Sequence, residues 1–180
     1  MEQPAEILRH ADVELRRWRM DDIDTLHRVM TESRDHLLPW LAFAATHDRK
    51  QGHDFLARSQ EQWASGEAYS YAITSGGEVI GSCGLHRRIG PSGLEIGYWI
   101  HPAWTGKGLA TMAAAALVRA GGQLPGIDHV EIHHDEGNPA SGAVARRLGF
   151  TEIARTRDPE GPRAAGQTGV EVRWRLRTAV

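Results

Sequence analysis

The stretch that decides the fold is residues 94–113, which read LEIGYWIHPAWTGKGLATMA. Its first part alternates between apolar and other residues, and because successive side chains of a strand point to opposite faces, the alternation predicts a strand with one buried face. The apolar face holds Leu94, Ile96, Tyr98 and Ile100, and the other face holds Glu95, Gly97 and Trp99. Pro102 ends the strand, and the turn TGKG leads directly into a helix that ends at Gly121 and Gly122.

The sequence on both sides of this stretch predicts an α/β mixture built on one sheet. Gly76 and Gly77 can form the tight turn of a hairpin, and Asn138 can cap a helix that begins at Pro139. The predicted strands are 12–18, 67–74, 78–88, 129–134, 150–155 and 170–176, and the predicted helices include one from Ile23 and one over 49–64. Residues 157–169 have the composition of a mobile loop. With 180 residues we expect one domain, 1–180.

The composition excludes several classes of function. A net charge of −2 without any block of Lys or Arg gives no electrostatic footprint for nucleic acid. No window reaches the roughly 18 apolar residues that a membrane span needs, and the N-terminus lacks the pattern of a signal peptide, so we expect a cytoplasmic protein without a membrane partner. Cys83 is the one cysteine, which excludes an intrachain disulfide and a cysteine-based zinc site.

Two segments are candidates for binding or chemistry. In TGKGLAT, residues 105–111, small residues between a strand and a helix let backbone N–H groups approach an anion, although such a segment can also be only a turn. The P-loop pattern is absent, and Thr111 stands where a dinucleotide fingerprint needs its third glycine, so ATP and NAD sites are disfavoured. In NPAS, residues 138–141, Ser141 lies in the first turn of a helix, where it can be purely structural.

The segment EIGYWIHPAWTGKGLATMA, followed after one strand by NPASGAVARRLGF, resembles the GCN5-related N-acetyltransferase (GNAT) superfamily. The match is closest to the RimJ/RimL type, which acetylates N-terminal amines of ribosomal proteins, and it extends to LRRWRMDD, HLLPWL and EVIGSCGLH. The resemblance implies the GNAT fold: a mixed, mostly antiparallel sheet, flanked by helices, that splays after the strand ending at Ile100. It also implies acetyl-CoA as cosubstrate, with the pantetheine arm in the gap, and no metal.

The resemblance also assigns site residues. It places Trp99, Ile100 and His101 beside the pantetheine arm, with backbone groups of Trp99 and His101 pairing with it, and Asn138 against the coenzyme from the following helix. The pyrophosphate would be held by amides of the glycine loop, namely Gly106, Lys107, Gly108, Leu109, Ala110 and Thr111. Two departures stand out: Thr105 replaces the Gln or Arg that begins the family pattern, and Ala145 occupies the place of the tyrosine that is the general acid in many members.

The RimL-like branch pairs a strand glutamate with a helix serine, which here are Glu95 and Ser141. In this reading Glu95 accepts the proton of the amine, directly or through water, and Ser141 protonates the departing thiolate. Without the resemblance, Glu95 reads as a surface glutamate paired with an Arg on the neighbouring strand.

The acceptor that we expect is the α-amine of a protein or peptide N-terminus, because its pKa near 8 makes deprotonation at neutral pH easier than for lysine. Two alternatives stay open: a small-molecule amine such as an antibiotic or metabolite, and a non-catalytic acyl-CoA-binding regulator. A homodimer is compatible with the sequence, which does not fix the oligomeric state.

The cluster His129, His133, His134 and Asp135 suggests a metal at first sight. Zinc sites need three or four convergent ligands, and adjacent strand residues such as His133 and His134 point to opposite faces, so we expect no metal there.

Overall fold

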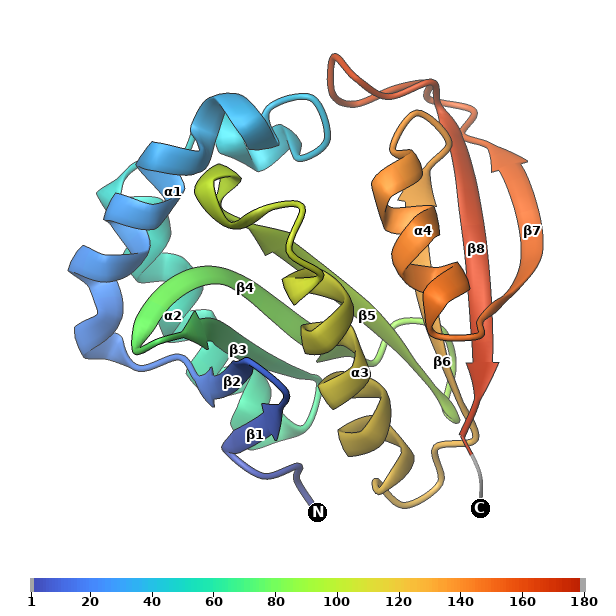
Figure 1. Cartoon of the computed structure of the whole chain (residues 1–180), viewed down its shortest axis with the longest axis horizontal. Coiled ribbons are helices and arrows are strands. Elements are labelled where there is room, and N and C mark those ends of the chain that lie inside the picture. The colour runs from blue at the N-terminus through green and yellow to red at the C-terminus, as the bar shows by residue number, and fades with distance from the viewer. Residues whose placement is uncertain (1, 179–180) are drawn as a thin grey trace.

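The computed structural model describes residues 2–178, and in it the chain forms an eight-stranded sheet with helices on both faces (Figure 1). The strand order is β1-β2-β3-β4-β5-β6-β8-β7. The strands are β1 Ile7–His10, β2 Val13–Arg17, β3 Ala68–Ser75, β4 Glu78–His86, β5 Gly93–Ile100, β6 His129–Asp135, β7 Thr151–Arg157 and β8 Val170–Arg177. The helices are α1 Ile23–Leu37, α2 Arg49–Ser65, α3 Leu109–Gly122 and α4 Pro139–Arg147, and short 3-10 turns lie at Met20–Asp22, Ala42–Ala45 and Pro102–Trp104.

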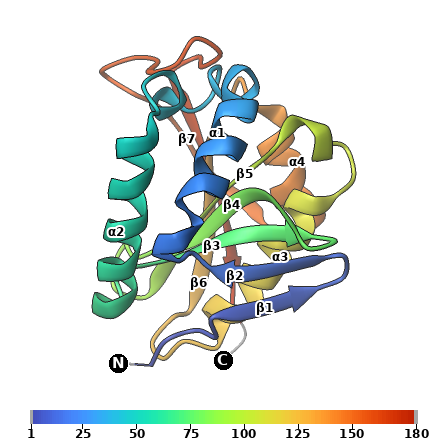
Figure 2. The ribbon, with the colours of Figure 1, turned by 90° about the vertical axis from the view of Figure 1, so that its left-hand side faces the viewer.

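The helices form two layers around the sheet. Helices α1 and α2 lie on one face, and α3 and α4 lie on the other (Figures 1 and 2). The larger core includes Leu94, Leu117 and Val130, all fully buried, and a smaller core includes Leu26 and Leu56 from α1 and α2. The alternating apolar face predicted for β5 is thus the face on which α3 packs.

The structure confirms the predicted elements, with two differences. Strand β1 has no counterpart in the prediction, because its residues are exposed or half-buried and show no apolar alternation. Strand β4 ends at His86, two residues earlier than predicted. Arg88 therefore lies in the loop between β4 and β5, which frees its side chain to reach toward the neighbouring strand.

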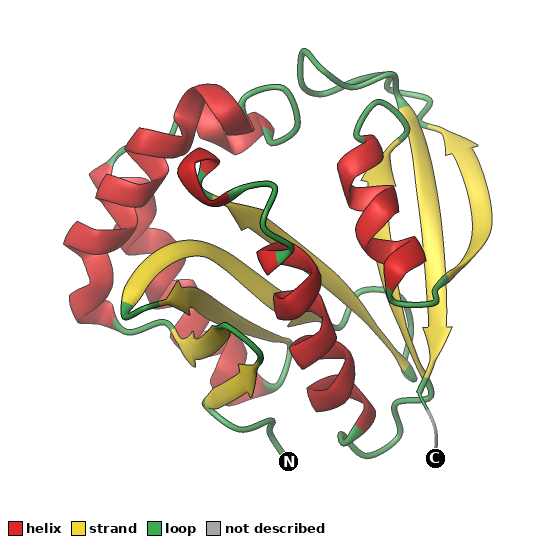
Figure 3. Ribbon diagram, in the orientation of Figure 1, coloured by secondary structure: helices red, strands yellow, loops and turns green. Residues whose placement is uncertain are grey.

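The sheet splits between β5 and β6. In the described residues every neighbouring pair of strands is antiparallel except this one, which is parallel and pairs only Gly93–Ile96 with His129–Ile132. Beyond that point β5 runs on to Ile100 and β6 to Asp135, and the two diverge (Figure 3). This confirms the expected splayed, mostly antiparallel sheet. None of the helices in residues 2–178 is long and apolar enough to cross a membrane.

Candidate active site

A cleft with a volume of about 660 Å³ lies where β5 and β6 diverge. Its walls come from β5, β6, the first turn of α4, the end of α1 and the loop between β7 and β8. The predicted residues that line it are Glu95, Trp99, Ile100, Ala110, Asn138 and Ser141. The split in the sheet therefore brings the candidate base, the candidate acid and one end of the glycine loop to a single cavity.

The glycine loop is shaped for an anion. Gly106 and Gly108 both have φ of +75°, a left-handed conformation that favours glycine, and Gly108 is the N-cap of α3. The first N–H groups of a helix have no partner inside the helix, so those after Gly108 are free to bind a ligand. The hydroxyl of Thr111 in this turn is buried and has no hydrogen-bond partner among the described residues. These features fit the pyrophosphate of a coenzyme.

The backbone at the end of β5 limits how His101 could bind the coenzyme. The N–H of His101 donates to the carbonyl of Ile80 at 2.7 Å, and the carbonyl of His101 accepts from the N–H of Trp104 at 2.9 Å. The N–H of His101 is thus engaged within the chain, while its carbonyl keeps a second lone pair that could accept from the pantetheine arm. Trp99 and Ile100 line the cleft and stay as candidates for that role.

The first turn of α4 carries the candidate acid. Asn138 is the N-cap residue, as predicted, but its side chain makes no capping hydrogen bond and instead donates to Oγ of Ser141 at 3.4 Å. Ser141 therefore accepts through its oxygen and keeps its own hydrogen free to donate. The Tyr98 hydroxyl lies 3.4 Å from the backbone carbonyl of Ser141, and burial raises the pKa of Tyr98 to about 12. Ala145 is fully buried, so α4 offers no acid at that position.

Glu95 lines the same cleft from β5 and is held by Arg88. Nε and Nη2 of Arg88 donate to the two carboxylate oxygens at 2.7 and 2.6 Å. Burial alone would raise the pKa of Glu95, but the hydrogen bonds and charge of Arg88, followed by the charges of His133 and His86, hold it below its usual value. The arginine pairing that the sequence allowed is thus present, and Glu95 is ionised.

His133 and Glu131 on β6 lie next to Glu95, and the sequence prediction gave neither of them a role in the site. Nε2 of His133 lies 2.6 Å from Oε2 of Glu131, and Nδ1 of His133 lies 3.7 Å from Oε2 of Glu95. His133 lines the cleft, whereas Glu131 is only 3% exposed. The sequence does carry a signal for this pair, since residues two apart on a strand share a face.

The loop over residues 158–169 ties the two sides of the cleft together. The Asp135 carboxylate at the end of β6 accepts from the N–H groups of Thr168 at 2.8 Å and Gly169 at 2.9 Å. On the other side, Gly166 N–H donates to the carbonyl of Pro39 at 2.9 Å, just after α1. Figure 1 shows this red loop reaching from β8 toward the end of α1. We call residues 158–169 the strap.

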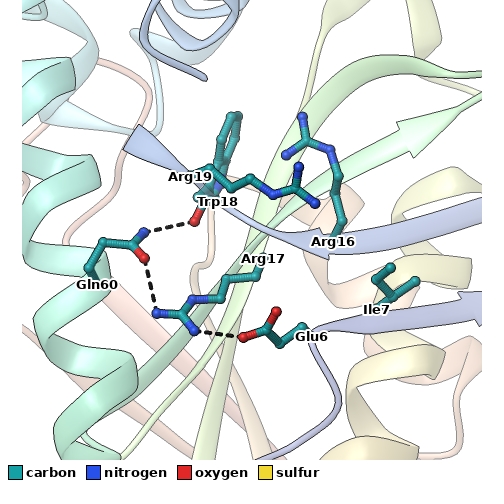
Figure 4. Close-up of a pocket in the computed structure, with 7 residues that line it drawn as sticks. All are labelled: Glu6, Ile7, Arg16, Arg17, Trp18, Arg19 and Gln60. Carbon is teal, nitrogen blue, oxygen red and sulfur yellow. Dashed lines mark hydrogen bonds and ion pairs between the residues drawn. The ribbon is translucent and has the colours of Figure 1, made fainter. Parts of the chain in front are cut away.

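A second, smaller pocket of about 260 Å³ lies at β2 and shares no lining residue with the cleft (Figure 4). Two of its three arginines have side-chain partners within the protein: Arg16 donates to both oxygens of Asp22 at 2.8 Å, and Arg17 donates to Glu6 at 2.8 Å and to Gln60 at 3.0 Å. Ion pairs thus engage Arg16 and Arg17 inside the protein, and a hydrogen bond to Gln60 joins β2 to α2.

The histidines at the end of β6 separate as expected. His133 faces Glu131 and Glu95, while Nε2 of His134 accepts from the indole N–H of Trp174 at 2.9 Å on the other face of the sheet. Within residues 2–178, no group of three or more His, Cys, Asp or Glu side chains is arranged to hold a metal ion.

The relatives compared below are all described as acetyltransferases. YdaF of Bacillus subtilis (strain 168), whose name describes a ribosomal N-acetyltransferase, is 27% identical over 141 residues, or 76% of each chain. Among solved structures, RimL, a ribosomal L7/L12 α-N-protein acetyltransferase in complex with coenzyme A, superposes with a TM-score of 0.87 at 22% identity, covering 96% of this chain and 98% of that one. The microcin C7 self-immunity acetyltransferase MccE, in complex with acetyl-CoA and AMP, gives 0.83 at 19% identity, covering 93% of both.

At such identities the structural matches show that the fold is shared. The family model described as an acetyltransferase (GNAT) domain matches residues 12–151, which span the glycine loop, the split in the sheet and α4. The chain therefore belongs to the GNAT family of acetyltransferases.

Proposed function

We propose that this acetyltransferase transfers the acetyl group of acetyl-CoA to the α-amine of a protein or peptide N-terminus. The observation that carries the proposal is that Glu95 and Ser141 line one cleft, which the strap also lines and bridges from Asp135 to Pro39. A strap tied to both sides favours an acceptor that enters end-on. An N-terminal amine also loses its proton near pH 8, whereas a lysine amine does so near 10.4. The name of RimL describes an α-N-protein acceptor for that protein, and the name of YdaF describes a ribosomal acceptor for that one.

The coenzyme fits along the split. The pyrophosphate lies against the N-terminus of α3, held by backbone amides from Gly106 to Thr111, where the helix dipole favours negative charge. The pantetheine arm passes along the unpaired end of β5 at Trp99 and Ile100, and Asn138 contacts it from the side of α4. The thioester then lies between Glu95 and Ser141.

The chemistry is direct transfer between two bound substrates. Glu95, directly or through water, accepts a proton from the amine, and the nitrogen attacks the thioester carbonyl. A backbone N–H near Trp99 donates to the developing oxyanion. The C–S bond then breaks, the Ser141 hydroxyl gives its proton to the departing thiolate, and the second proton lost by the attacking nitrogen returns to the Ser141 oxygen. Overall an ammonium and a thioester become an amide, a thiol and one released proton.

The surroundings of this reaction are also part of the proposal. The region that matches the family model and the two closing strands belong to one continuous sheet. This supports a single catalytic domain over 1–180. A cytoplasmic location agrees with the expected acceptor.

The test is a panel of acceptors with acetyl-CoA. Purified protein is incubated with peptides that carry a free N-terminus, with the same peptides blocked at the N-terminus but carrying lysine, and with small amines, and the free thiol is measured. We expect turnover with the free N-terminus alone. Turnover with small amines only would give the function to the small-molecule alternative. Binding of acetyl-CoA without consumption of any amine would indicate a regulator.

A further inference from the structure

The base assigned to this reaction is a weak one. Both oxygens of Glu95 bind Arg88, at 2.7 and 2.6 Å, and its pKa lies below the usual value for the reasons given above. A carboxylate in that state takes a proton only briefly, because its arginine partner stabilises the ionised form. Efficient removal of a proton from an amine therefore needs a second group that can hold it.

Two histidines face Glu95, one from each neighbouring strand. His86 lies directly across from it on β4, but burial and the nearby positive charge of Arg88 lower the pKa of His86 to about 4. His86 is thus neutral at pH 7 and a poor proton acceptor. His133 lies on β6, 3.7 Å from Glu95 Oε2, and has a carboxylate on its far side.

That carboxylate, Glu131, is built to orient the ring of His133. It is 3% exposed, and it accepts from Nε2 of His133 at 2.6 Å and from Nε and Nη2 of Arg175 at 2.7 and 2.5 Å. Burial alone would raise the pKa of Glu131, but these hydrogen bonds hold it below its usual value, so it is ionised. An ionised carboxylate at Nε2 places the ring hydrogen there and leaves Nδ1, which faces Glu95, as the acceptor.

We propose that His133 is the terminal proton acceptor of the acetyl transfer: the proton taken from the amine by Glu95, or by water beside it, passes to Nδ1 of His133. The resulting imidazolium lies between the carboxylates of Glu131 and Glu95, which stabilise its charge. Each turnover moves one proton from nitrogen to Nδ1 and then to solvent, while the thiolate takes its proton from Ser141 and the second proton of the nitrogen restores the Ser141 hydroxyl. The inference rests on the proposed function, and it makes His133 a proton-holding residue that acts through Glu95.

Other charged side chains lie near Glu95, His133 and Glu131 and contribute to the electrostatic potential there. Arg88 comes from the loop after β4, and Arg173 and Arg175 come from β8, where Arg173 lies directly across from His133. Glu171 lies on the same strand and binds Arg173 at 2.5 Å. These guanidinium groups and carboxylates are the fixed charges around the His133 ring.

The test compares matched variants in steady-state assays from pH 6 to 9. His133→Gln keeps an N–H donor toward Glu131 but cannot hold the proton, so we expect kcat to fall about 10²-fold at pH 7, with acetyl-CoA affinity unchanged. The rate should recover in part at high pH. Glu131→Gln removes the charge that favours the imidazolium, so the rising limb of its pH–rate profile should move to lower pH while its maximum falls.

His129→Gln is the matched control. His129 lies on the same strand, contacts the same Glu131 carboxylate at 3.8 Å and is as buried as His133, but it does not line the cleft. Its variant should keep the wild-type kcat and pH profile. Equal losses in the His129 and His133 variants, or a wild-type profile in His133→Gln, would overturn the proposal by showing a purely structural cluster.

A second measurement does not depend on the acceptor. In ¹⁵N NMR of the wild-type protein, we expect the neutral ring of His133 to carry its hydrogen on Nε2 and to gain a second proton as the pH falls. A ring that carries its hydrogen on Nδ1, or that stays doubly protonated up to pH 9, would exclude the relay. If the wild-type protein acetylates no amine, the proposed function fails, and the NMR result still decides whether the ring can accept a proton.

Discussion

The split divides the sheet into a first half, β1 to β5, and a second half, β6, β8 and β7, and the two differ in how their faces are packed. In β3 and β4 nearly every residue is buried, because helices pack on both faces, and Tyr69, Tyr71 and Ile73 are fully buried. In β6 and β8 one face packs through Val130 and Ile132, while the other carries ion pairs such as Arg175 with Glu131. The first half supplies the stability of the fold, and the second supplies charged groups to a cleft. The catalytic chemistry that we propose lies where the two meet.

Because of this division, substitutions in different parts of the sheet should change different measured properties. Changes in the first half should alter stability, changes at the split should alter coenzyme binding or turnover, and changes in the second half should alter acceptor binding and pH dependence.

The largest effect is expected at the edge of the split, in Gly108→Asp. The new carboxylate would repel the pyrophosphate, and the left-handed backbone at φ +75° would be strained by any side chain, so measurable binding of acetyl-CoA should be lost. Calorimetry tests this, with Gly126→Asp as control. Gly126 has nearly the same φ, +76°, and lies beyond the other end of α3, so it adds the same strain without the repulsion. Unchanged affinity in folded Gly108→Asp would remove this loop from the site.

The second largest effect is expected in Ser141→Ala, which distinguishes the role of the acid from that of the base. Loss of the hydroxyl leaves the thiolate without its proton donor, so the intermediate collapses backward and kcat should fall about 10²-fold. Acetyl-CoA affinity should stay the same, and high pH should not restore the rate. Glu95→Gln is the comparison, since a lost base is partly replaced as the amine deprotonates at high pH. Near-normal turnover of both variants from pH 6 to 9 would assign the protons to water or backbone groups.

The same division explains how far the sequence could predict the molecule. Elements of the first half, and β5 in particular, follow from local alternation and from glycines at turns, because burial of an apolar face leaves a pattern with period two. The split itself came only from the family resemblance. The array of Glu95, His133 and Glu131 depends on the register that places Glu95 opposite Glu131, and no local pattern fixes the register of two parallel strands separated by a helix. The ties of the strap to Asp135 and Pro39 are likewise long-range contacts.

A smaller effect is expected in the second half, in Asp135→Asn. Partial burial would raise the pKa of Asp135, but N–H donors from Thr168, Gly137 and Gly169 hold it below its usual value. Loss of these charged hydrogen bonds should cost about 1 to 2 kcal/mol of unfolding free energy and loosen the strap. The KM for the acceptor should rise about tenfold, equivalent to about 1.4 kcal/mol, with kcat nearly unchanged.

The pH dependence of that stability loss has a definite sign. A carboxyl whose pKa is lowered by folding stabilises the protein above its unfolded pKa, and this contribution is lost as the pH falls through the folded value. The difference between wild type and Asp135→Asn, measured by urea unfolding, should therefore be full at pH 7 and shrink below about pH 4. A constant difference down to pH 3 would show that the charge of Asp135 does not hold the strap.

The smallest effect is expected for Cys83→Ala, in the first half. Cys83 lies on β4 between Tyr71 and Tyr98 of the neighbouring strands and is 4% exposed, and burial raises the pKa of its thiol. A thiol that stays protonated is a poor nucleophile, so Cys83 packs in the core and carries no acetyl group. Removing its sulfur should cost on the order of 1 kcal/mol of stability, as small core deletions do, and leave kcat within about twofold. The steady-state pattern should show both substrates bound together. Ping-pong kinetics with an acetyl group trapped on Cys83 would replace direct transfer by a covalent mechanism, and would make the well-packed half of the sheet a participant in the chemistry.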